Sequence, residues 1–256
     1  MISIATWNVN SLRVRLPQLV AWLGANPVDI LALQETKLTD PEFPVTEIAA
    51  LGYQVAYSGQ KTYNGVAVLA RSPISDLIVD LPGINDPQRR LLAASVAGVR
   101  VINVYVPNGQ AVDSDKYAYK LEWLAALEKF LAAELAAHPR LLVLGDFNIA
   151  PEDRDVHDPA AWQGSVLVSP AERSALMRLE ALGLGDLFRR FEQAERSFSW
   201  WDYRQGAYRR NNGLRIDLIL GSQALAARCN YCRIDREPRA WERPSDHAPC
   251  IAGFDI

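Results

Sequence analysis

The segment Leu141-Leu142-Val143-Leu144-Gly145-Asp146-Phe147-Asn148 combines a strongly apolar run with two polar side chains at its end. Four consecutive aliphatic residues are typical of a strand that is buried on both faces, and Gly145 ends the run. Asp146 and Asn148 lie two positions apart, so their side chains point the same way in an extended chain. Placing them at the end of a core strand costs desolvation free energy, which favours a functional role. The alternative is that Asp146 simply starts a turn.

The same arrangement, an apolar strand with polar residues at or near its end, recurs along the chain. We predict further strands of this kind at residues 2–8, 29–36, 99–105, 214–220 and 250–254. Strand ends that are far apart in sequence can meet at one edge of a pair of packed sheets. The polar residues beside these strands are Asn8, Glu35, Tyr105, Asp146, Asn148, Asp217, Asp246 and His247. Each one alone has an incidental explanation, but their recurrence indicates a site.

The order of the remaining elements indicates the fold class. We expect additional strands at 53–57, 65–70 and 91–97, and helices at 15–24, 116–137, 171–182 and 186–192. Many strands with few long helices predict an α/β fold with layered mixed sheets. The glycine patterns of dinucleotide-binding folds and of phosphate-binding loops are absent. Residues 149–170 are predicted to form an irregular functional loop, because loops of this length are uncommon in compact domains.

Length and composition set broad limits. The 256 residues are 49% hydrophobic and carry a net charge of −3. They suit one domain over residues 1–256, because no linker-like segment divides them. The charge argues weakly against a nucleic-acid-binding protein, although a basic surface can surround an acidic centre. We expect neither a signal peptide nor a membrane span. The odd number of cysteines suggests reduced thiols in a cytoplasmic protein, and the Cys229-x-x-Cys232 spacing is interpreted as incidental.

The chemistry of the polar cluster predicts a hard metal ion. Carboxylates and carboxamides with a single histidine suit Mg²⁺ or Mn²⁺ better than zinc. Such an ion commonly shares a phosphate oxygen, so hydrolysis of a phosphate ester is the expected reaction. We expect Asp246 to accept the imidazole N–H of His247, which leaves the other ring nitrogen for a phosphate. The alternatives are a turn histidine at His247 and an Asp217 that pairs with Arg215 on an exposed strand face.

Seven motifs spread over the chain give it a resemblance to a known family. They are Thr6-Trp7-Asn8-Val9-Asn10, Leu33-Gln34-Glu35-Thr36-Lys37, Gly65-Val66-Ala67, Asn103-Val104-Tyr105-Val106-Pro107-Asn108-Gly109, Gly145-Asp146-Phe147-Asn148, Gly213-Leu214-Arg215-Ile216-Asp217 and Pro244-Ser245-Asp246-His247-Ala248-Pro249. With these motifs the chain resembles the exonuclease III-type abasic-site endonucleases of the endonuclease/exonuclease/phosphatase superfamily. The resemblance implies a four-layer α/β sandwich, in which two packed mixed sheets are flanked by helices. It also implies a Mg²⁺-dependent nuclease that acts on duplex DNA, with Mn²⁺ as a substitute metal, and we expect a monomer.

The resemblance implies a metal-binding end of the site. Glu35 would be the main metal ligand, with Asn8 beside it. Asp246 would orient His247 and contribute to the metal site. His247 would bind the scissile phosphate and stabilise its developing charge.

The resemblance also implies a phosphate-binding end. Asp146 would activate the attacking water or assist the leaving oxygen, and the resemblance leaves these two roles open. Asn148 and Tyr105 would fix the phosphate. Asp217 would support either the histidine or a second metal position.

Loops around the cluster are implied to contact DNA. The residues on these loops are Lys61, Tyr63, Asn64, Arg89, Arg90, Asn108, Gly109, Leu167, Arg209 and Arg210. Contacts to backbone phosphates would supply salt-dependent affinity without sequence preference. Trp200 and Leu214 would wall the pocket for the damaged nucleotide, and the alternative for Trp200 is a place in the core.

Leu167 is the one departure from the family pattern, because family members that incise abasic sites well tend to have a small residue there. We hypothesise that Leu167 crowds the continuing strand and weakens incision. Removal of 3′-phosphates and 3′→5′ exonuclease activity at nicks and blocked 3′ ends would survive. The alternative is that Leu167 packs inward. One rival function is hydrolysis of inositol phosphates or sphingomyelin, which the Gly213-Leu214-Arg215-Ile216-Asp217 run and the Arg-rich loop disfavour. The other is a non-catalytic RNA-binding role, which the intact acid cluster disfavours.

Overall fold

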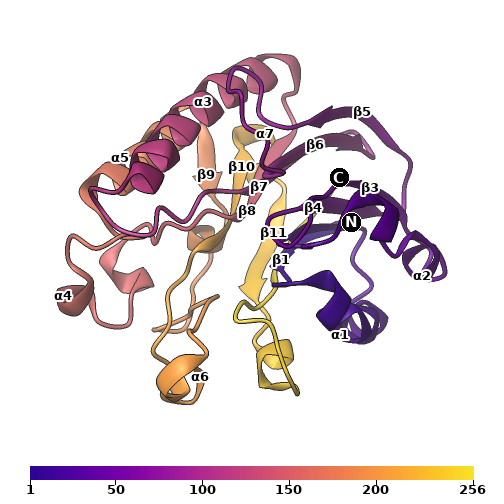
Figure 1. Ribbon diagram of the computed structural model, residues 1–256. Helices are drawn as coiled ribbons and strands as arrows, with labels where there is room; N and C mark the ends of the chain where they lie inside the picture. The colour runs from indigo at the N-terminus through magenta and orange to yellow at the C-terminus, as the bar shows by residue number, and fades with distance from the viewer.

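The computed structural model describes residues 1–256 and contains two six-stranded sheets (Figure 1). The strands of the first sheet are β1 (Ile2–Asn8), β2 (Ile30–Gln34), β3 (Gln54–Ser58), β4 (Val66–Ala70), β11 (Cys229–Ile234) and β12 (Cys250–Phe254). Their order across the sheet is β11-β12-β1-β2-β4-β3. The sheet is mixed, because β1 and β2 are parallel while the other neighbours are antiparallel.

The second sheet repeats this plan. Its strands are β5 (Ile74–Val79), β6 (Leu91–Val96), β7 (Val99–Tyr105), β8 (Leu141–Asp146), β9 (Leu184–Asp186) and β10 (Asp217–Ser222). Their order is β5-β6-β7-β8-β10-β9, and only β7 and β8 are parallel. In each sheet a helix joins the parallel pair, α1 (Leu12–Ala25) in the first and α3 (Asp115–Ala137) in the second, as parallel strands require a crossover.

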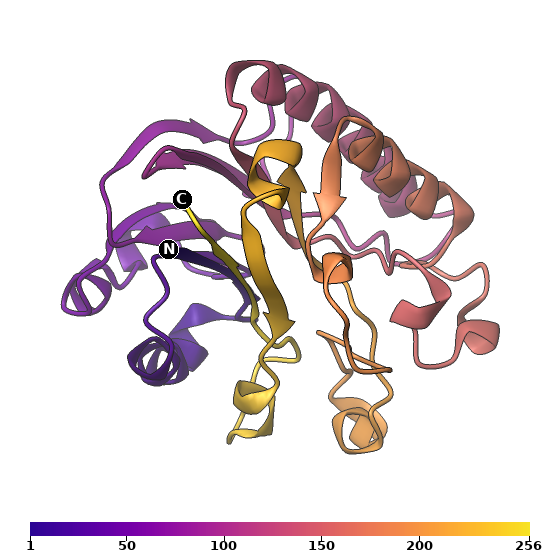
Figure 2. The same ribbon diagram turned by 180° about the vertical axis from the view of Figure 1, so that it is seen from behind.

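Three apolar clusters make the layers. The largest holds 24 buried residues from the facing sides of the two sheets. A second lies between the second sheet and helices α3 and α5 (Pro170–Ala181), and a third between the first sheet and α1. Figures 1 and 2 show α3 and α5 together on one flank, with α1 and α2 (Val45–Ala49) on the other. The predicted four-layer α/β sandwich is confirmed.

The central strand β8 contributes side chains to two of these apolar clusters. Leu142 and Leu144 face the other sheet, whereas Leu141 and Val143 face the helices. Successive side chains of a strand point to opposite faces, so a continuous aliphatic run is what a strand covered on both sides needs.

Three strands were not predicted, and all three lie at sheet edges. They are β5, β9 and β11. Leu77 and Val79 of β5 are exposed, and the pairing of β5 and β11 with their neighbours is irregular, so neither shows a clean alternation of apolar and polar residues. The predicted helix at 186–192 is wrong, because this region holds the end of β9 and a short 3₁₀ turn (Phe188–Arg190).

The loop at 149–170 is less irregular than predicted. It contains a 3₁₀ turn (Asp153–Asp155) and the short helix α4 (Pro159–Trp162). Together with the loop that carries helix α6 (Ala207–Arg210), it projects from the edge of the sandwich at which β8 ends (Figure 1). None of the helices combines the length and apolar character that crossing a membrane requires.

Gly145 permits the close approach of β7 and β8 just before the end of β8. A side chain there would place its Cβ 1.9 Å from the carbonyl oxygen of Val104, and the backbone φ is 145°. Only glycine fits such a position without a shift of the backbone. Gly145 therefore helps to set the position of the next residue, Asp146, beside the end of β7.

Candidate active site

Cross-strand pairing brings three of the predicted residues into one row. Asp146 at the end of β8 pairs with Tyr105 at the end of β7 and with Asp217 at the start of β10. Across the sandwich, Asn8 at the end of β1 pairs with Gln34, so Glu35 follows directly. The ends of both sheets therefore contribute side chains to one place.

A carboxamide joins the two sheets at this place. The Nδ2 of Asn8 donates to Glu35 Oε1 at 2.8 Å and to Asp146 Oδ2 at 2.9 Å. The Asn8 Oδ1 accepts the backbone N–H of Asn10 at 3.0 Å. Asn8 thus presents its N–H groups to the two carboxylates and its oxygen to the backbone. The prediction of Asn8 as a metal ligand does not match this orientation, in which Asn8 is a bridge between two acids.

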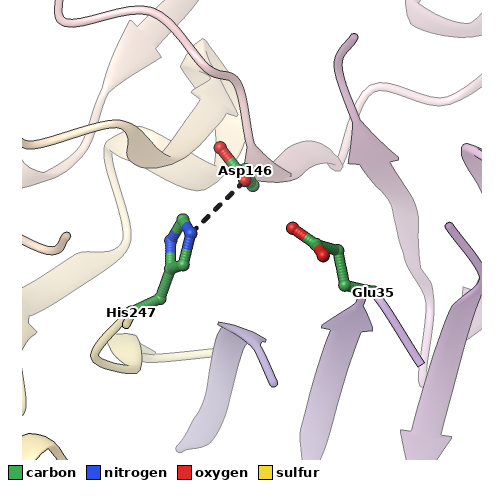
Figure 3. A group of neighbouring side chains, drawn as sticks. All are labelled: Glu35, Asp146 and His247. Atoms are coloured by element: carbon green, nitrogen blue, oxygen red, sulfur yellow. Dashed lines mark ion pairs between the residues drawn. The ribbon is translucent and has the colours of Figure 1, made fainter. Parts of the chain in front are cut away.

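His247 completes the cluster from the first sheet's side. One ligand atom from each of Glu35, Asp146 and His247 lies within 4.8 Å of the others. Figure 3 shows the three side chains directed toward one another, and His247 Nε2 lies 3.7 Å from Asp146 Oδ2. The residues predicted from distant strand ends therefore do converge.

The carboxylate that orients His247 is Asp217. His247 Nδ1 lies 2.9 Å from Asp217 Oδ2 and 3.1 Å from its Oδ1. Asp217 is itself fixed by Ser199, whose hydroxyl donates to Oδ2 at 2.7 Å. The prediction that Asp246 orients His247 is wrong, because Asp217 lies at Nδ1 of the ring while the Asp246 carboxylate accepts from Asn10 and Trp200. The alternative of an exposed Asp217 paired with Arg215 is also excluded, since both residues are buried and Arg215 pairs with Asp155.

Asp246 faces a second group of side chains beside the cluster. It accepts the Asn10 Nδ2 at 2.9 Å and the Trp200 indole N–H at 3.0 Å. Burial alone would raise its pKa, but the charge of His247 and these two hydrogen bonds bring the pKa below its ordinary value. Trp200 is only partly buried and has its polar edge on Asp246, so it belongs to the site rather than to the core.

Burial and charge shift the ionisation of the two central groups. The removal of Asp146 from water raises its pKa well above the ordinary value, although the charge of His247 opposes this. Burial lowers the pKa of His247, but the carboxylates of Asp217 and Asp146 outweigh burial and raise it well above the usual range. The pair therefore holds an imidazolium beside a carboxyl group that can carry a proton near neutral pH.

The donor set fits a hard divalent cation. Glu35 and Asp146 offer carboxylate oxygens, and their side chains point toward each other and toward His247 (Figure 3). Lys37 also lies at this point, with Nζ 2.9 Å from Glu35 Oε2 and 2.6 Å from Asn10 Oδ1. Lys37 neutralises part of the negative charge of the cluster, which a bound cation would also do.

A second set of polar groups lies next to Asp146. The Asn148 N–H donates to Asp146 Oδ1 at 2.9 Å, and its Oδ1 accepts the Asn108 side-chain amide at 3.1 Å. Burial, together with the charges of Glu35 and Asp146, raises the pKa of Tyr105 well above its ordinary value, so its hydroxyl stays protonated. These groups supply neutral hydrogen-bond donors beside the acid cluster.

Four residues of the site have a strained backbone conformation. Asn10, Glu35, Lys37 and Asn148 have φ values of 43°, 52°, 53° and 49°. This left-handed region is costly for residues other than glycine, and such residues gather at functional sites. The surrounding hydrogen bonds hold them in place.

A cavity of about 670 Å³ adjoins the acid cluster at Tyr105. It gathers residues from three of the segments that were predicted to contact DNA, namely Tyr63, Asn64, Arg90, Asn108 and Gly109. The Arg90 guanidinium lies over the Tyr105 ring, 4.7 Å from its centroid. Lys61 is exposed on the same loop as Tyr63 but does not line this cavity.

Other predicted DNA contacts lie elsewhere. Arg209 and Arg210 are exposed on α6, outside this cavity, and Arg89 pairs with Asp80. Leu214 has no exposed surface and packs with Val156 and Val168, so the prediction that it contacts DNA does not match this structure.

Leu167 is 5% exposed, so its side chain packs inward, as the alternative interpretation expected. Its φ of 77° lies in the left-handed region, where glycine is favoured over leucine.

Sequence reasoning missed four residues that complete the site: Asn10, Lys37, Ser199 and Lys120. Asn10 and Lys37 stand two positions after the predicted site residues Asn8 and Glu35. This spacing could have identified both of them from the sequence. Ser199 and Lys120 are distant in sequence from the acids, and nothing local marked them.

Comparisons with known proteins agree with this geometry. Residues 5–247 match the model of the Endonuclease/Exonuclease/phosphatase family. Exodeoxyribonuclease III of Haemophilus influenzae is 37% identical, over 97% of this chain and 98% of that protein.

Solved structures are similar along the whole chain. One is the 3′ phosphatase NExo from Neisseria bound to a product DNA hairpin, with 49% identity, a TM-score of 0.98 and full coverage of both chains. Another is an AP endonuclease from Archaeoglobus fulgidus, with 40% identity, a TM-score of 0.96 and the same coverage. The match of residues 5–247 to the family model and these similarities lead to one conclusion: the chain belongs to the endonuclease/exonuclease/phosphatase family, in which it is a hydrolase of the exodeoxyribonuclease III and AP endonuclease type.

Proposed function

We propose that the protein is a Mg²⁺-dependent DNA repair nuclease that removes phosphate and nucleotides from 3′ ends of duplex DNA. The observation that carries the proposal is the convergence of Glu35, Asp146 and His247 beside a polar cavity. The named activities of the similar proteins, a 3′ phosphatase and an exodeoxyribonuclease III, support the choice of substrate.

The metal would be held mainly by Glu35, with Asp146 next to it. When bound, it would supply positive charge to the phosphate oxygens and lower the barrier to displacement. Because Asn8 donates to both carboxylates, it fixes their separation.

His247 is suited to hold the scissile phosphate. Its Nδ1 is bound to Asp217, so the proton on Nε2 is free to point toward an anion near Asp146. A fixed imidazolium stabilises charge that develops on a phosphate oxygen, and it needs no rearrangement during the reaction.

Asp146 is suited to proton transfer. Its pKa is raised by burial, so it can accept a proton from the attacking water or return one to the leaving oxygen near neutral pH. Tyr105 and Asn148 would donate hydrogen bonds to the same phosphate and so fix its orientation.

The cavity at Tyr105 is suited to the DNA strand that carries this phosphate. Its lining combines the Arg90 cation with the amides of Asn64 and Asn108 and the exposed ring of Tyr63. Such groups contact backbone and sugar without reading sequence, which a repair enzyme requires.

A panel of end-labelled duplexes tests the proposal. The duplexes carry a 3′-phosphate at a nick, a recessed 3′-hydroxyl or an internal abasic site, each with and without Mg²⁺. We expect Mg²⁺-dependent removal of the 3′-phosphate to be the fastest reaction. Hydrolysis of an inositol phosphate with no reaction on any duplex would overturn the proposal.

Abasic-site incision is the second candidate, supported by the similar AP endonuclease. We propose that it is slower because the inward-packed Leu167, with its φ of 77°, fixes the 165–169 loop, whereas glycine at this position would let the loop move aside for the continuing strand. The ratio of incision to 3′-phosphate removal in the same panel measures this preference.

A further inference from the structure

Lys120 is a buried cation that is not part of the acid cluster. Its side chain has no exposed surface, although it lies on α3, a helix of the outer layer. Its ammonium donates to Glu172 Oε1 at 2.5 Å, to the Asn148 carbonyl at 2.6 Å and to the Asn108 carbonyl at 3.1 Å. All three N–H groups of the ammonium are therefore used.

Two of these acceptors belong to the site. Asn148 follows the end of β8 and hydrogen-bonds Asp146 through its N–H, and Asn108 lines the cavity and donates to the Asn148 side chain. Asn148 also has a φ of 49°, a conformation that needs support from its surroundings. Lys120 fixes the backbones of Asn108 and Asn148 by donating hydrogen bonds to their carbonyl oxygens.

The third acceptor, Glu172, extends the network to the loop of Leu167. Glu172 is fully buried, and its Oε1 accepts the Leu167 N–H at 3.0 Å. Its Oε2 accepts the Ser169 N–H and hydroxyl, which closes a capping box at the start of α5. The Leu167 carbonyl in turn accepts the Ala150 N–H at 2.8 Å.

The energetics argue that this ion pair has a purpose beyond folding. Desolvation of two charges offsets their attraction, and replacing a buried pair by apolar residues of similar volume is often neutral or stabilising. This pair also holds Asn148 and Leu167, which both have left-handed backbone conformations, and that contribution does not depend on the net stability of the ion pair. Its bonds end on the backbones that carry the phosphate-binding amides.

We propose that Lys120 is a positioning residue, which acts with Glu172 to fix Asn148, Asn108 and the 165–169 loop in the geometry that the scissile phosphate requires. The inference rests on the proposed function for the identity of that phosphate. Lys120 itself does not touch the substrate; it acts through the two asparagine backbones.

The double variant Lys120→Met/Glu172→Gln isolates this role. Methionine fills a similar volume without donors. Glutamine has one acceptor oxygen in place of two, so it can keep the N–H of Ser169 in the capping box but not the N–H of Leu167 as well. Compared with Glu172→Gln alone, the double variant additionally loses the bonds from Lys120 to the Asn108 and Asn148 carbonyls. The single variant Glu172→Gln keeps these bonds, because even an uncharged lysine has two N–H groups. Lys129→Met, on the exposed side of the same helix, is the matched control.

We expect the double variant to remove a 3′-phosphate with a kcat lower by roughly 10- to 100-fold, because small misplacement of a positioning group has effects of this size. The KM for DNA should change less than about threefold, since Tyr63, Asn64 and Arg90 of the cavity have no bond to Lys120 and stay in place. Glu172→Gln and Lys129→Met should stay within about threefold of the wild type in kcat. The Asn148 side-chain amide resonances should shift in the double variant only.

Three results would overturn the inference. They are a folded double variant with wild-type kcat, a Glu172→Gln variant as slow as the double variant, and Asn148 resonances that do not move. If the double variant does not fold, Lys120→Met alone replaces it, because Glu172 then keeps its hydrogen bonds from Leu167 and Ser169; a wild-type kcat for this variant contradicts the inference. A wild-type enzyme inactive on every DNA substrate refutes the proposed function instead, and the resonances of Asn148 still test the role of Lys120.

Discussion

Replacement of Asp217 by asparagine tests how the site controls the charge of His247. Asparagine keeps the shape of the side chain, and its oxygen can still accept from Nδ1 of His247. What it removes is a negative charge 2.9 Å from the ring. At an effective dielectric constant of about 20, one charge at this separation contributes roughly 6 kcal/mol, or ~4 pH units of pKa.

In the metal-free wild-type protein the pKa of His247 is raised to about 10, because Asp217 and Asp146 outweigh the effect of burial. The Asp217→Asn variant should therefore titrate near or below the ordinary histidine value of about 6.5. Nitrogen NMR of the imidazole groups measures both values, and assignment is simple because the chain has 3 histidines. The metal-free state is required, since a bound cation would change the field at the ring.

The raised pKa also makes stability depend on pH. The folded value of about 10 lies above the unfolded value, so the stabilisation is fully present below pH ~6.5 and is lost as pH rises toward 10. Urea unfolding of the wild type should show this loss, and Asp217→Asn should show less of it. A wild-type His247 that titrates near 6.5, or a variant unchanged from the wild type, would refute the reasoning.

Four further substitutions follow from the geometry. Glu35→Ala should reduce Mg²⁺-dependent activity by at least about 100-fold, and excess Mg²⁺ should restore part of it; full activity at ordinary Mg²⁺ would remove Glu35 as a ligand. Trp200→Phe removes the N–H that Asp246 accepts and should cost about 1.5–3 kcal/mol of unfolding free energy at pH 7; the cost should fall at acid pH once Asp246 is protonated, which its lowered pKa delays. Leu167→Gly relieves an unfavourable φ and opens the loop, so the ratio of abasic incision to 3′-phosphate removal should rise by about tenfold; an unchanged ratio excludes Leu167 as a selectivity residue. Gly145→Ala sets a Cβ against the Val104 carbonyl and should destabilise the protein by more than about 3 kcal/mol in urea unfolding; a wild-type midpoint would contradict the close approach of β7 and β8.

Much of this arrangement follows from patterns that are local in the sequence. The run Leu141–Leu144 predicts a strand covered on both faces, and the polar residues after it and after β1 and β2 predict a site at one edge. Periods of two and of 3.6 residues are properties of the chain itself, so the layers could be predicted. The edge strands β5, β9 and β11 could not, because one partner and an exposed face leave no regular pattern.

The partners within the site depend on tertiary structure. Asp246 is the sequence neighbour of His247, yet Asp217 is the residue at its ring, because the pairing of β8 with β10 brings it there. Lys120 illustrates the same limit, since its position on a helix predicts a solvent-exposed or half-buried lysine. Only the packing of α3 against the ends of β7 and β8 reveals that its ammonium is fully buried.

The most direct measurement is an anomalous difference map from a crystal of the protein that holds Mn²⁺ and a duplex with a 3′-phosphate. The account predicts a Mn²⁺ peak bound by Glu35 between the two sheets, with the 3′-phosphate contacted by His247 and Asn148. A Mn²⁺ peak away from Glu35, or a phosphate that does not reach His247, would contradict it.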